Sequence, residues 1–367
     1  MKDKIAIVGA GIAGLALAIL ATEQGHNVTV YEKNSAISNL GAGITLWPNA
    51  MFVISQMGLL EDVKRVSGMP LSLHSIDKYG NTQSMMNIEL LNQECGYPSI
   101  AILRKELMQI FYQKALKLGV SIKFQHSVNP LLLQQMKSQF DLIVGADGRM
   151  YSTTRQLLFD ERPQPQYQGF INIVGISQLD CQLTPFIKEY RGNGQRFGIV
   201  PVHSGWCYWA AAWRESLACK QSSRDWGHEL EHRFEDWPPD IKNMIKKQKA
   251  EKIKPIYLYD LDPLPYWHQE NILLIGDAAH ASLPTSGQGA CQALEDAWHL
   301  VTVLTNYASL DQALNAFYQQ RIAKATAAQN AGRHVASQVF SSESITVVNS
   351  TLPNVKQLTQ LWMYGLS

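Results

Sequence analysis

The sequence lacks an excess of either charge. Its 32 Lys and Arg residues stand against 31 Asp and Glu residues, which leaves a formal net charge of +1 over 367 residues. Proteins that bind nucleic acid or an anionic membrane surface usually carry a clear basic excess, so neither partner is expected. A local basic run at residues 241–255 is interpreted as the solvated face of a helix, with steering of an anionic ligand as the alternative.

Cysteine is scarce and follows no ligand pattern. The cysteines are odd in number, and no two of them form a CxxC pair. This excludes a recognisable zinc site or disulfide framework, and no bound metal is expected. A reducing cytoplasm is the compartment that suits such free thiols best. The five residues are Cys95, Cys181, Cys207, Cys219 and Cys291.

A long apolar run is also missing. The uncharged stretch from Ile5 to Thr22 falls short of the roughly 20 apolar residues that a membrane span requires. Its glycines also fall at particular positions that neither a membrane segment nor a signal peptide needs. We therefore expect no integral membrane span.

What the chain does contain is an alternation of short buried strands and helices. We predict strands at residues 4–8, 27–32, 140–148 and 271–275, and helices at 15–24, 47–66, 103–120, 289–305 and 309–330. From about residue 167 to 264 the pattern changes to longer, partly alternating strands, interrupted by a charged helical segment at 222–250.

These two patterns predict an α/β protein with two sheet layers. Because the second sheet is expected to be mostly antiparallel, the whole chain is predicted to be α+β overall. A Rossmann-like dinucleotide-binding domain is expected from three separate pieces of chain, with a mostly antiparallel sheet domain inserted between them and a helical tail at the end. The predicted pieces are 1–72, 97–165 and 265–330 for the first domain, 73–96 and 166–264 for the sheet domain, and 331–367 for the tail.

A glycine-rich turn follows the first predicted strand. Gly9, Gly11 and Gly14 form GxGxxG ahead of a helix, where they allow a tight turn, a close approach to a pyrophosphate and close packing of helix on strand. Glu32 ends the second strand 18 residues later, where a carboxylate can accept the ribose hydroxyls of an adenosine. This half of the sequence predicts a bound dinucleotide.

A second carboxylate ends the returning strand at 271–275. Asp277 is placed to bind the ribityl chain or pyrophosphate of a flavin half in the same crevice. The loop Ser286–Gly289 then leads into a helix, whose N-terminal N–H groups and dipole would stabilise negative charge on a reduced flavin. His280, which lies between them, is interpreted as a structural hydrogen-bonding residue rather than a base.

Together these motifs resemble those of the class A FAD-dependent aromatic monooxygenases, the p-hydroxybenzoate hydroxylase-like group. The resemblance runs over nearly the whole chain, down to LWMYG at 361–365. The motif sequences are most similar to those of hydroxylases of urate, quinolones and related N-heterocycles. The matching pieces are GAGIAGL with Glu32, GAGITLWPNA at 41–50, Arg104 in ILRKEL, GADG at 145–148 and GDAAHASLPTSGQGACQALEDA at 276–297.

The resemblance implies a tightly but non-covalently bound FAD and assigns residues to it. Arg104 would contact FAD phosphate or ribityl groups, and Asp147-Gly148 matches a motif that the family uses for both FAD and nicotinamide. Arg155 lies eight residues after Asp147 where the family usually has seven, which leaves its role open. The full cofactor set is Gly9, Ala10, Gly11, Ile12, Ala13, Gly14, Glu32, Lys33, Gly43, Ile44, Arg104, Asp147, Gly148, Asp277, Pro284, Gly287, Gln288 and Gly289.

The resemblance also implies the reaction. NADH or NADPH would dock transiently and reduce the flavin, and O2 would then form a C4a-hydroperoxide that hydroxylates the substrate. The sequence contains no second GxGxxG for the nicotinamide, which suits transient docking. No side chain is assigned as certainly catalytic; Pro284, Gly287 and Gly289 would line the flavin ring.

The substrate is expected to be a small flat aromatic or N-heteroaromatic molecule. Arg196 and Tyr208 are favoured as pocket residues together with Pro284 and Thr285, and plain sheet packing is the alternative for the first two. Bacterial urate hydroxylases of the group carry an acid where this chain has Thr285, so urate itself is not favoured. The protein is expected to be a monomer or a homodimer.

Other functions compete with this one. A monooxygenase that inactivates a xenobiotic such as an antibiotic, or a flavin-dependent reductase of the same fold, is the nearest alternative. A non-catalytic flavin-binding protein is a further one, and a halogenase is disfavoured because the WxWxIP signature is missing. The tail is expected to dock on its own domain, with a membrane-surface role as a minor alternative because it lacks a basic face.

Overall fold

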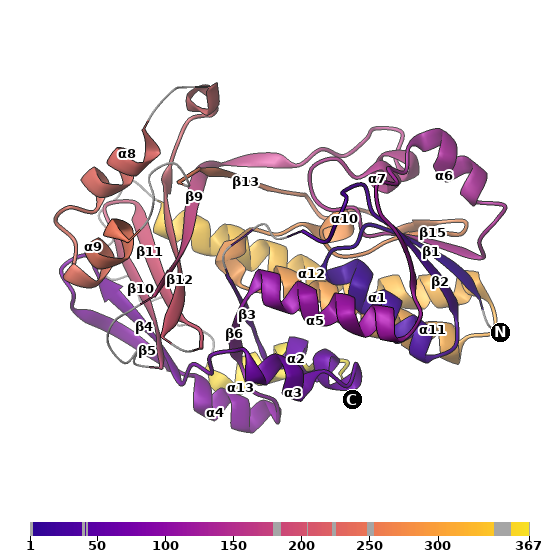
Figure 1. Cartoon of the computed structure of the whole chain (residues 1–367), viewed down its shortest axis with the longest axis horizontal. Helices are drawn as coiled ribbons and strands as arrows, with labels where there is room; N and C mark the ends of the chain where they lie inside the picture. Colours follow the sequence, from indigo (N-terminus) through magenta and orange to yellow (C-terminus); the bar gives the residue numbers. More distant parts are fainter. Residues whose placement is uncertain are drawn as a thin grey trace.

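The computed structural model describes residues 3–38, 41, 43–178, 185–203, 205–221, 225–247, 253–340 and 354–366. Its strands form two large sheets near the two ends of an elongated molecule, with a two-stranded sheet between them (Figure 1). One large sheet is nearly all parallel and the other mostly antiparallel. The predicted fold class is therefore confirmed.

The six-stranded sheet has the order β14-β15-β8-β1-β2-β7, and only its edge pair β14–β15 is antiparallel. Helix α1 (Ile12–Glu23) is buried without a break from Ile12 to Ala21, as expected for a helix that is apolar on all sides. Helices α5 (Arg104–Lys117) and α11 (Gly289–Asn306) contact α1. The strands are β1 (Lys4–Val8), β2 (Asn27–Tyr31), β7 (Ser121–Lys123), β8 (Leu142–Gly145), β14 (His268–Gln269) and β15 (Ile272–Leu274).

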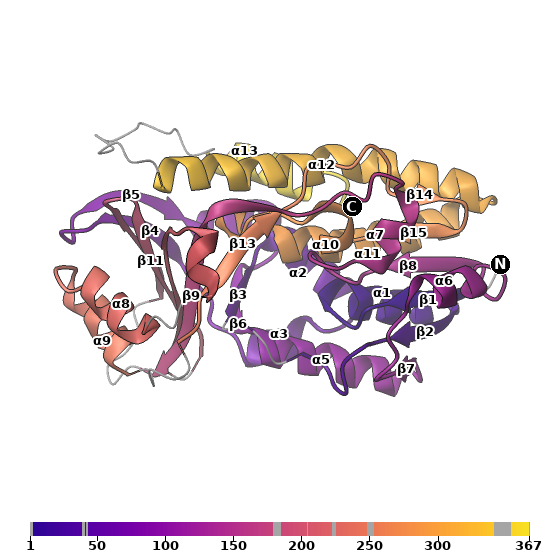
Figure 2. The same ribbon diagram turned by 90° about the horizontal axis from the view of Figure 1, so that it is seen from above.

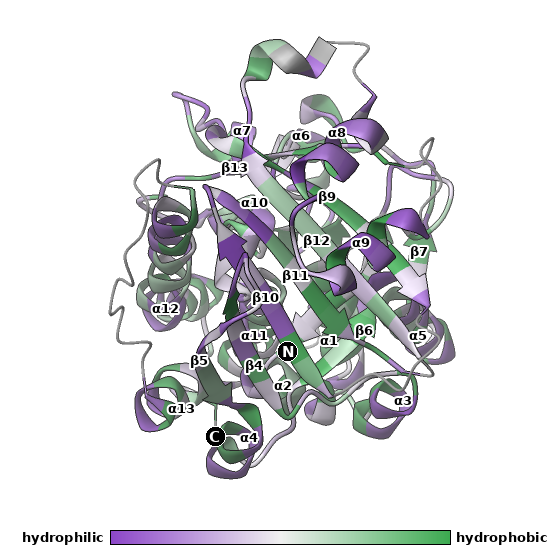
Figure 3. Ribbon diagram, turned by 90° about the vertical axis from the view of Figure 1, so that its left-hand side faces the viewer, coloured by the Kyte–Doolittle hydropathy of each residue, from purple (hydrophilic) through white to green (hydrophobic). Residues whose placement is uncertain are grey.

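The seven-stranded sheet has the order β13-β9-β12-β11-β10-β4-β5, with a single parallel pair, β4–β10. Helices α8 (Trp226–Arg233) and α9 (Pro239–Lys246) cover one of its faces, as Figure 3 shows from that end of the molecule. The strands are β4 (Ser72–Asp77), β5 (Thr82–Asn87), β9 (Gln166–Gln178), β10 (Phe186–Gly192), β11 (Gln195–Pro201), β12 (Trp206–Arg214) and β13 (Ile256–Asp260).

The two-stranded sheet pairs β3 (Gly43–Leu46) with β6 (Ile100–Leu103) and lies between the two large sheets (Figure 2). Helix α2 (Pro48–Gln56) follows β3 directly, with proline at its first position. Near the C-terminus, α13 (Val355–Met363) packs against α4 (Ile88–Cys95) and α2. The remaining elements are α3 (Leu60–Arg65), α6 (Pro130–Met136), α7 (Thr153–Leu158), α10 (Asp277–His280), α12 (Leu310–Val339), η1 (Leu217–Gln221) and η3 (Pro284–Ser286).

Two helix predictions need correction. The helix expected at 47–66 is broken into α2 and α3 around Gly58, whose φ of +66° lies in the left-handed region that glycine favours. The helix expected to end at 330 continues as α12 to Val339, and it passes close to Leu283 at Gly332. A Cβ at Gly332 would lie 3.3 Å from the Leu283 backbone oxygen. Within the described residues, every helix is too short or too polar to cross a bilayer.

Candidate cofactor and substrate site

The carboxyl ends of four neighbouring strands meet at one edge of the six-stranded sheet. In the order β15, β8, β1, β2 they lead into Asp277, Asp147, the Gly9–Gly14 turn and Glu32. In open parallel sheets this edge is where dinucleotides bind. The structure therefore brings together motif residues that are up to 268 positions apart, from Gly9 to Asp277.

The three glycines of the turn have different surroundings. A Cβ at Gly9 (φ +107°) would lie 2.4 Å from the Ala146 carbonyl oxygen, and one at Gly14 would lie 2.0 Å from the Gly9 carbonyl oxygen. Both positions therefore require glycine for packing. A Cβ at Gly11 would meet no atom within 4 Å, so this backbone faces open space, as an approach by a pyrophosphate requires.

Glu32 is buried and braces the turn. One carboxylate oxygen accepts the Ala10 N–H at 2.9 Å, and the other accepts the backbone and side-chain N–H groups of Asn34 at 2.9 and 2.6 Å. Each carboxylate oxygen has two lone pairs, so the oxygen that accepts a single bond from Ala10 keeps capacity for a hydroxyl donor. Lys33, by contrast, is solvent-exposed.

Asp277 opens the short helix α10 beside α1 and α11. Gly276 (φ +58°) makes the turn before it, and a Cβ there would lie 3.0 Å from the Cβ of Ala13 and 3.4 Å from that of Ala293. The Asp277 side chain is 39% exposed and pairs with Arg149 at 3.2 Å. Arg149, which sequence reasoning missed, also donates to the Tyr259 carbonyl at 2.8 Å and lies in the lengthened turn after Asp147.

That lengthened turn gives Arg155 a structural role. The side chain is fully buried and donates to the carbonyl oxygens of Ala278 at 3.0 Å, Arg149 at 2.6 Å and Pro163 at 3.3 Å. These bonds tie the turn to α10 and to Pro163. The Asp147 carboxylate accepts hydroxyl donors from Ser152 and Thr154, so it too stabilises the turn.

The predicted flavin-ring loop lies beside the segment that follows β3. Gly287 has a φ of +64°, and a Cβ there would lie 3.0 Å from Trp47 Nε1. Trp47 Nε1 and Gln288 Nε2 are buried N–H donors with no hydrogen-bond acceptor among the residues described. Arg104 Nε, next to the Gly41 turn, is a third such donor. Buried donors without acceptors are costly, so these three suit a bound molecule rich in acceptors, as FAD is.

Tyr208 and Arg196 lie on the face of the seven-stranded sheet that points away from α8 and α9. A Cβ at Gly43 would lie 1.9 Å from the Tyr208 ring, so the ring packs directly on β3, and its hydroxyl bonds Thr45 Oγ1 at 2.7 Å. Burial raises the pKa of Tyr208 to about 12, which keeps it a neutral phenol. The opposite face of β12, with Trp209 and Trp213, packs under α8 and α9, as the alternation predicts.

Arg196 belongs to a small ionic cluster. Arg196 Nη2 lies 3.0 Å from a Glu189 carboxylate oxygen, and Arg191 pairs with the other oxygen of the same carboxylate. Burial would raise the pKa of Glu189, but the two guanidinium groups outweigh it and hold the pKa at about 2. Two cations on one carboxylate leave one net positive charge in this cluster.

The other two predicted substrate residues lie on the flavin-ring loop, in the turn η3. The Thr285 hydroxyl donates to the Gly332 carbonyl at 2.6 Å, which ties the loop to α12. Pro284 begins the same turn.

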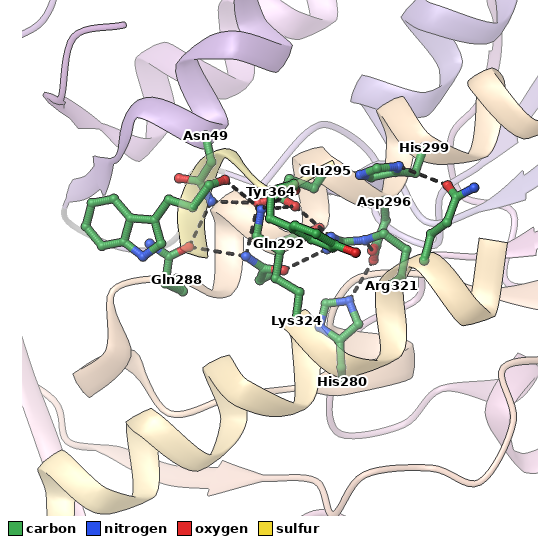
Figure 4. Close-up of polar contacts among 12 residues, drawn as sticks. Asn49, His280, Gln288, Gln292, Glu295, Asp296, His299, Arg321, Lys324 and Tyr364 are labelled. Carbon is green, nitrogen blue, oxygen red and sulfur yellow. Dashed lines mark hydrogen bonds and ion pairs between the residues drawn. The ribbon is translucent and has the colours of Figure 1, made fainter. Parts of the chain in front are cut away.

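Sequence reasoning missed a buried polar network beneath the loop. Figure 4 shows that side chains from α2, α10, α11 and α12 converge there. Arg321 is fully buried and pairs with Glu295 at 2.6 Å and Asp296 at 2.8 Å. His280 bonds Asp296 at 2.6 Å, which supports the structural role expected for it.

Comparison with known proteins agrees with this geometry. The family described as FAD binding domain matches residues 2–331. The chain is 31% identical over 331 residues to the aurachin C monooxygenase/isomerase of Stigmatella aurantiaca, covering 88% of this chain and 85% of that protein. It is 28% identical over 308 residues to the FAD-dependent urate hydroxylase of Mycolicibacterium vanbaalenii, covering 80% and 78%.

Solved structures share the fold. HpxO of Klebsiella pneumoniae, complexed with FAD and uric acid, superposes with a TM-score of 0.80 at 23% identity, covering 99% of this chain and 92% of that chain. PqsL of Pseudomonas aeruginosa, described as a probable FAD-dependent monooxygenase, gives 0.78 at 23% identity, covering 93% and 97%.

Proposed function

Because this chain belongs to the FAD binding domain family of class A flavin monooxygenases, and is an FAD-dependent monooxygenase, we propose that it uses NADH or NADPH and O2 to hydroxylate a small flat aromatic or N-heteroaromatic substrate. The observation that carries the proposal is the meeting of the Gly9–Gly14 turn, Glu32 and Asp277 at adjacent strand ends, with buried unpaired donors beside the ring loop.

The chain's own residues would hold FAD in sequence along the crevice. Glu32 would accept ribose hydroxyls, the open backbone at Gly11 would face the pyrophosphate, and Asp277 would bind the ribityl region. Arg104 would supply a cation beside the same groups. When bound, FAD supplies hydride acceptance and oxygen activation; the protein binds it, orients it and excludes water.

The ring end of the site suits a substrate that accepts hydrogen bonds. The Arg196–Glu189–Arg191 cluster carries a net positive charge, and Tyr208 stays protonated beside β3. An electron-rich ring with carbonyl, phenolic or carboxylate oxygens matches that lining. The relatives named for urate and aurachin C support the heterocyclic class, while Thr285 in place of an acid argues against urate itself.

The test is turnover with a panel of substrates. The purified protein is expected to be yellow, and NADH or NADPH oxidation should accelerate with one class of compound, consume O2 and yield a product one oxygen atom heavier. The Arg196→Met variant should keep its flavin while the KM for that compound rises about tenfold or more, through loss of a charged hydrogen bond.

The same assay separates the alternatives. Ligand-stimulated NAD(P)H oxidation without O2 uptake would identify a reductase. A flavoprotein that no compound stimulates would contradict the hydroxylase proposal and leave a flavin-binding role. An antibiotic that is oxygenated more efficiently than simple heterocycles would place the protein among the xenobiotic-inactivating monooxygenases.

A further inference from the structure

Asn49 is a fully buried polar residue to which the function proposed above assigns no role. It is the second residue of α2, and it follows β3 after only Trp47 and Pro48. Its side-chain amide Nδ2 donates to Gln288 Oε1 at 3.0 Å and to Glu295 Oε1 at 2.7 Å (Figure 4). One amide group therefore joins the chain after β3 to the N-terminus of α11.

The two segments that Asn49 joins are the two that would flank the flavin ring. On one side, β3 begins with Gly43 and Ile44; on the other, Gly287 and Gln288 precede α11. The segments also touch where Trp47 Nε1 approaches Gly287. In the proposed binding mode, the distance between β3 and the loop before α11 would set the space available to the flavin ring.

Glu295, which anchors this connection, is held by several partners. Glu295 Oε2 is occupied by Arg321 Nη1 at 2.6 Å and by Lys324 Nζ at 2.9 Å, which leaves Oε1 for Asn49 and for Gln292 at 3.1 Å. Glu295 and Arg321 are fully buried. Lys324 also donates to the carbonyl oxygens of Trp362 at 2.6 Å and Tyr364 at 3.2 Å, so the end of α13 is fixed to the same group.

We propose that Asn49 is a positioning residue: it acts through Gln288 to hold the N-terminus of α11 at a fixed distance from β3, and so aligns the flavin ring with that helix end. The inference rests on the proposed function. The field of a helix N-terminus acts over about one turn, so a small displacement of the loop weakens its stabilisation of negative charge on a reduced flavin.

Two properties of the FAD-loaded protein test this without any substrate: the dissociation constant of FAD and the midpoint potential of the bound flavin. We expect Asn49→Ala to weaken FAD binding about tenfold, the loss expected for a hydrogen bond to a charged group, and to lower the potential. Asn49→Asp should be worse on both, because it places a carboxylate beside the oxygens of Glu295 and Gln288.

A double-mutant cycle identifies the route of the effect. If Asn49 acts through Gln288, the Asn49→Ala/Gln288→Ala protein should bind FAD no more weakly than the weaker single variant. Asn129→Ala is the matched control, because Asn129 caps α6 with a bond to Leu132 N at 2.8 Å. This control should lose some thermal stability and keep the wild-type FAD affinity and potential.

Three results would overturn the inference. Asn49→Ala could behave like Asn129→Ala, the two single effects could add fully, or Gln288→Ala could bind FAD like the wild type. The last of these can be measured even when the Asn49 variants fold poorly. All three leave the hydroxylase proposal intact, since that proposal fails only in the turnover assay.

Discussion

At the scale of single residues, burial decides which form each side chain presents to the site. Tyr208 is enclosed by β3, which raises its pKa to about 12, so it can donate a hydrogen bond at every ordinary pH. Glu189 is buried more deeply, yet two guanidinium groups keep its pKa at about 2 and the carboxylate ionised. Burial therefore leaves Tyr208 as a neutral phenol, whereas Glu189 stays charged because it is ion-paired with Arg191 and Arg196.

Asp277 is the residue whose loss should most directly reveal the cofactor site. We expect Asp277→Ala to purify with much less FAD, because its carboxylate is the group that we propose binds the ribityl region. Arg149 keeps its bonds to the carbonyl oxygens of Tyr259 and Ser282 in this variant, so the turn should persist. The flavin-to-protein absorbance ratio measures the effect. Asp62→Ala, on the surface of α3, is the control; equal flavin content in both would reject the role.

At the scale of elements, the two faces of β12 have different surroundings. Trp209 is fully buried, stacks on Phe197 at 5.3 Å between ring centroids and donates to Ser177 Oγ at 3.1 Å. Trp206 lies on the opposite face and is 38% exposed. The strand therefore offers the same residue type in two environments.

Trp209→Ala should lower the free energy of unfolding by about 3–5 kcal/mol, the usual range for removing a buried aromatic side chain. Trp206→Ala should lower it by less than about 1 kcal/mol, since little contact is lost. Urea denaturation followed by circular dichroism measures both. Equal losses would show that the two faces of β12 are not energetically distinct.

The contact between α11 and α12 has a pH dependence of its own. Burial would raise the pKa of Asp296, but His280 and Arg321 outweigh it and hold the pKa at about 2, below its ordinary value of 3.8. A carboxylate whose pKa is lowered by folding stabilises the protein at pH values above its unfolded-state pKa. This stabilisation is lost as the pH falls through the folded-state pKa. The contribution of Asp296 should therefore be full above about pH 4 and disappear as the pH approaches 2.

Unfolding measurements between pH 5 and 2 test this, with Asp296→Asn as the comparison. The variant should be less stable than the wild type at about pH 5, because Arg321 and His280 lose their charged partner, by about 3 kcal/mol or more for a broken buried pair. Its stability should also fall less steeply toward acid. A wild-type curve and a variant curve of equal slope would contradict the assignment.

At the scale of the whole molecule, the sequence predicts short-range features well and long-range polar contacts poorly. The Gly9–Gly14 turn and the acids that end strands could be predicted because each depends on neighbours in the chain. Asn49 and Glu295 are 246 residues apart, and nothing in the local pattern of either indicates the other. Arg149 was missed for a related reason: it lies 128 residues before Asp277 in the chain, and no local pattern connects the two.

The six-stranded sheet is built from segments that lie far apart in the chain. This predicts how FAD changes the thermal stability of the protein. A ligand that binds only the folded state stabilises it by about 2.7 kcal/mol at a free concentration 100 times its dissociation constant. Since β1, β8 and β15 all end at the proposed cofactor site, we expect the thermal midpoint to rise with each increase in FAD concentration. Calorimetry of apoprotein at several FAD concentrations checks this; a midpoint independent of FAD would contradict it.

The helices α8 and α9 give the seven-stranded sheet a core of its own, and among the described residues this core shares no buried residue with the core around the six-stranded sheet. The other face of that sheet also contributes to folding, because Ile187 and Val200 belong to the first core and Phe170 and Ala212 pack in a third cluster with α12. Arg196 lies on that face but belongs to none of these clusters. We therefore expect substitutions of Arg196 to change which substrate is accepted and to leave both cores and FAD binding unchanged.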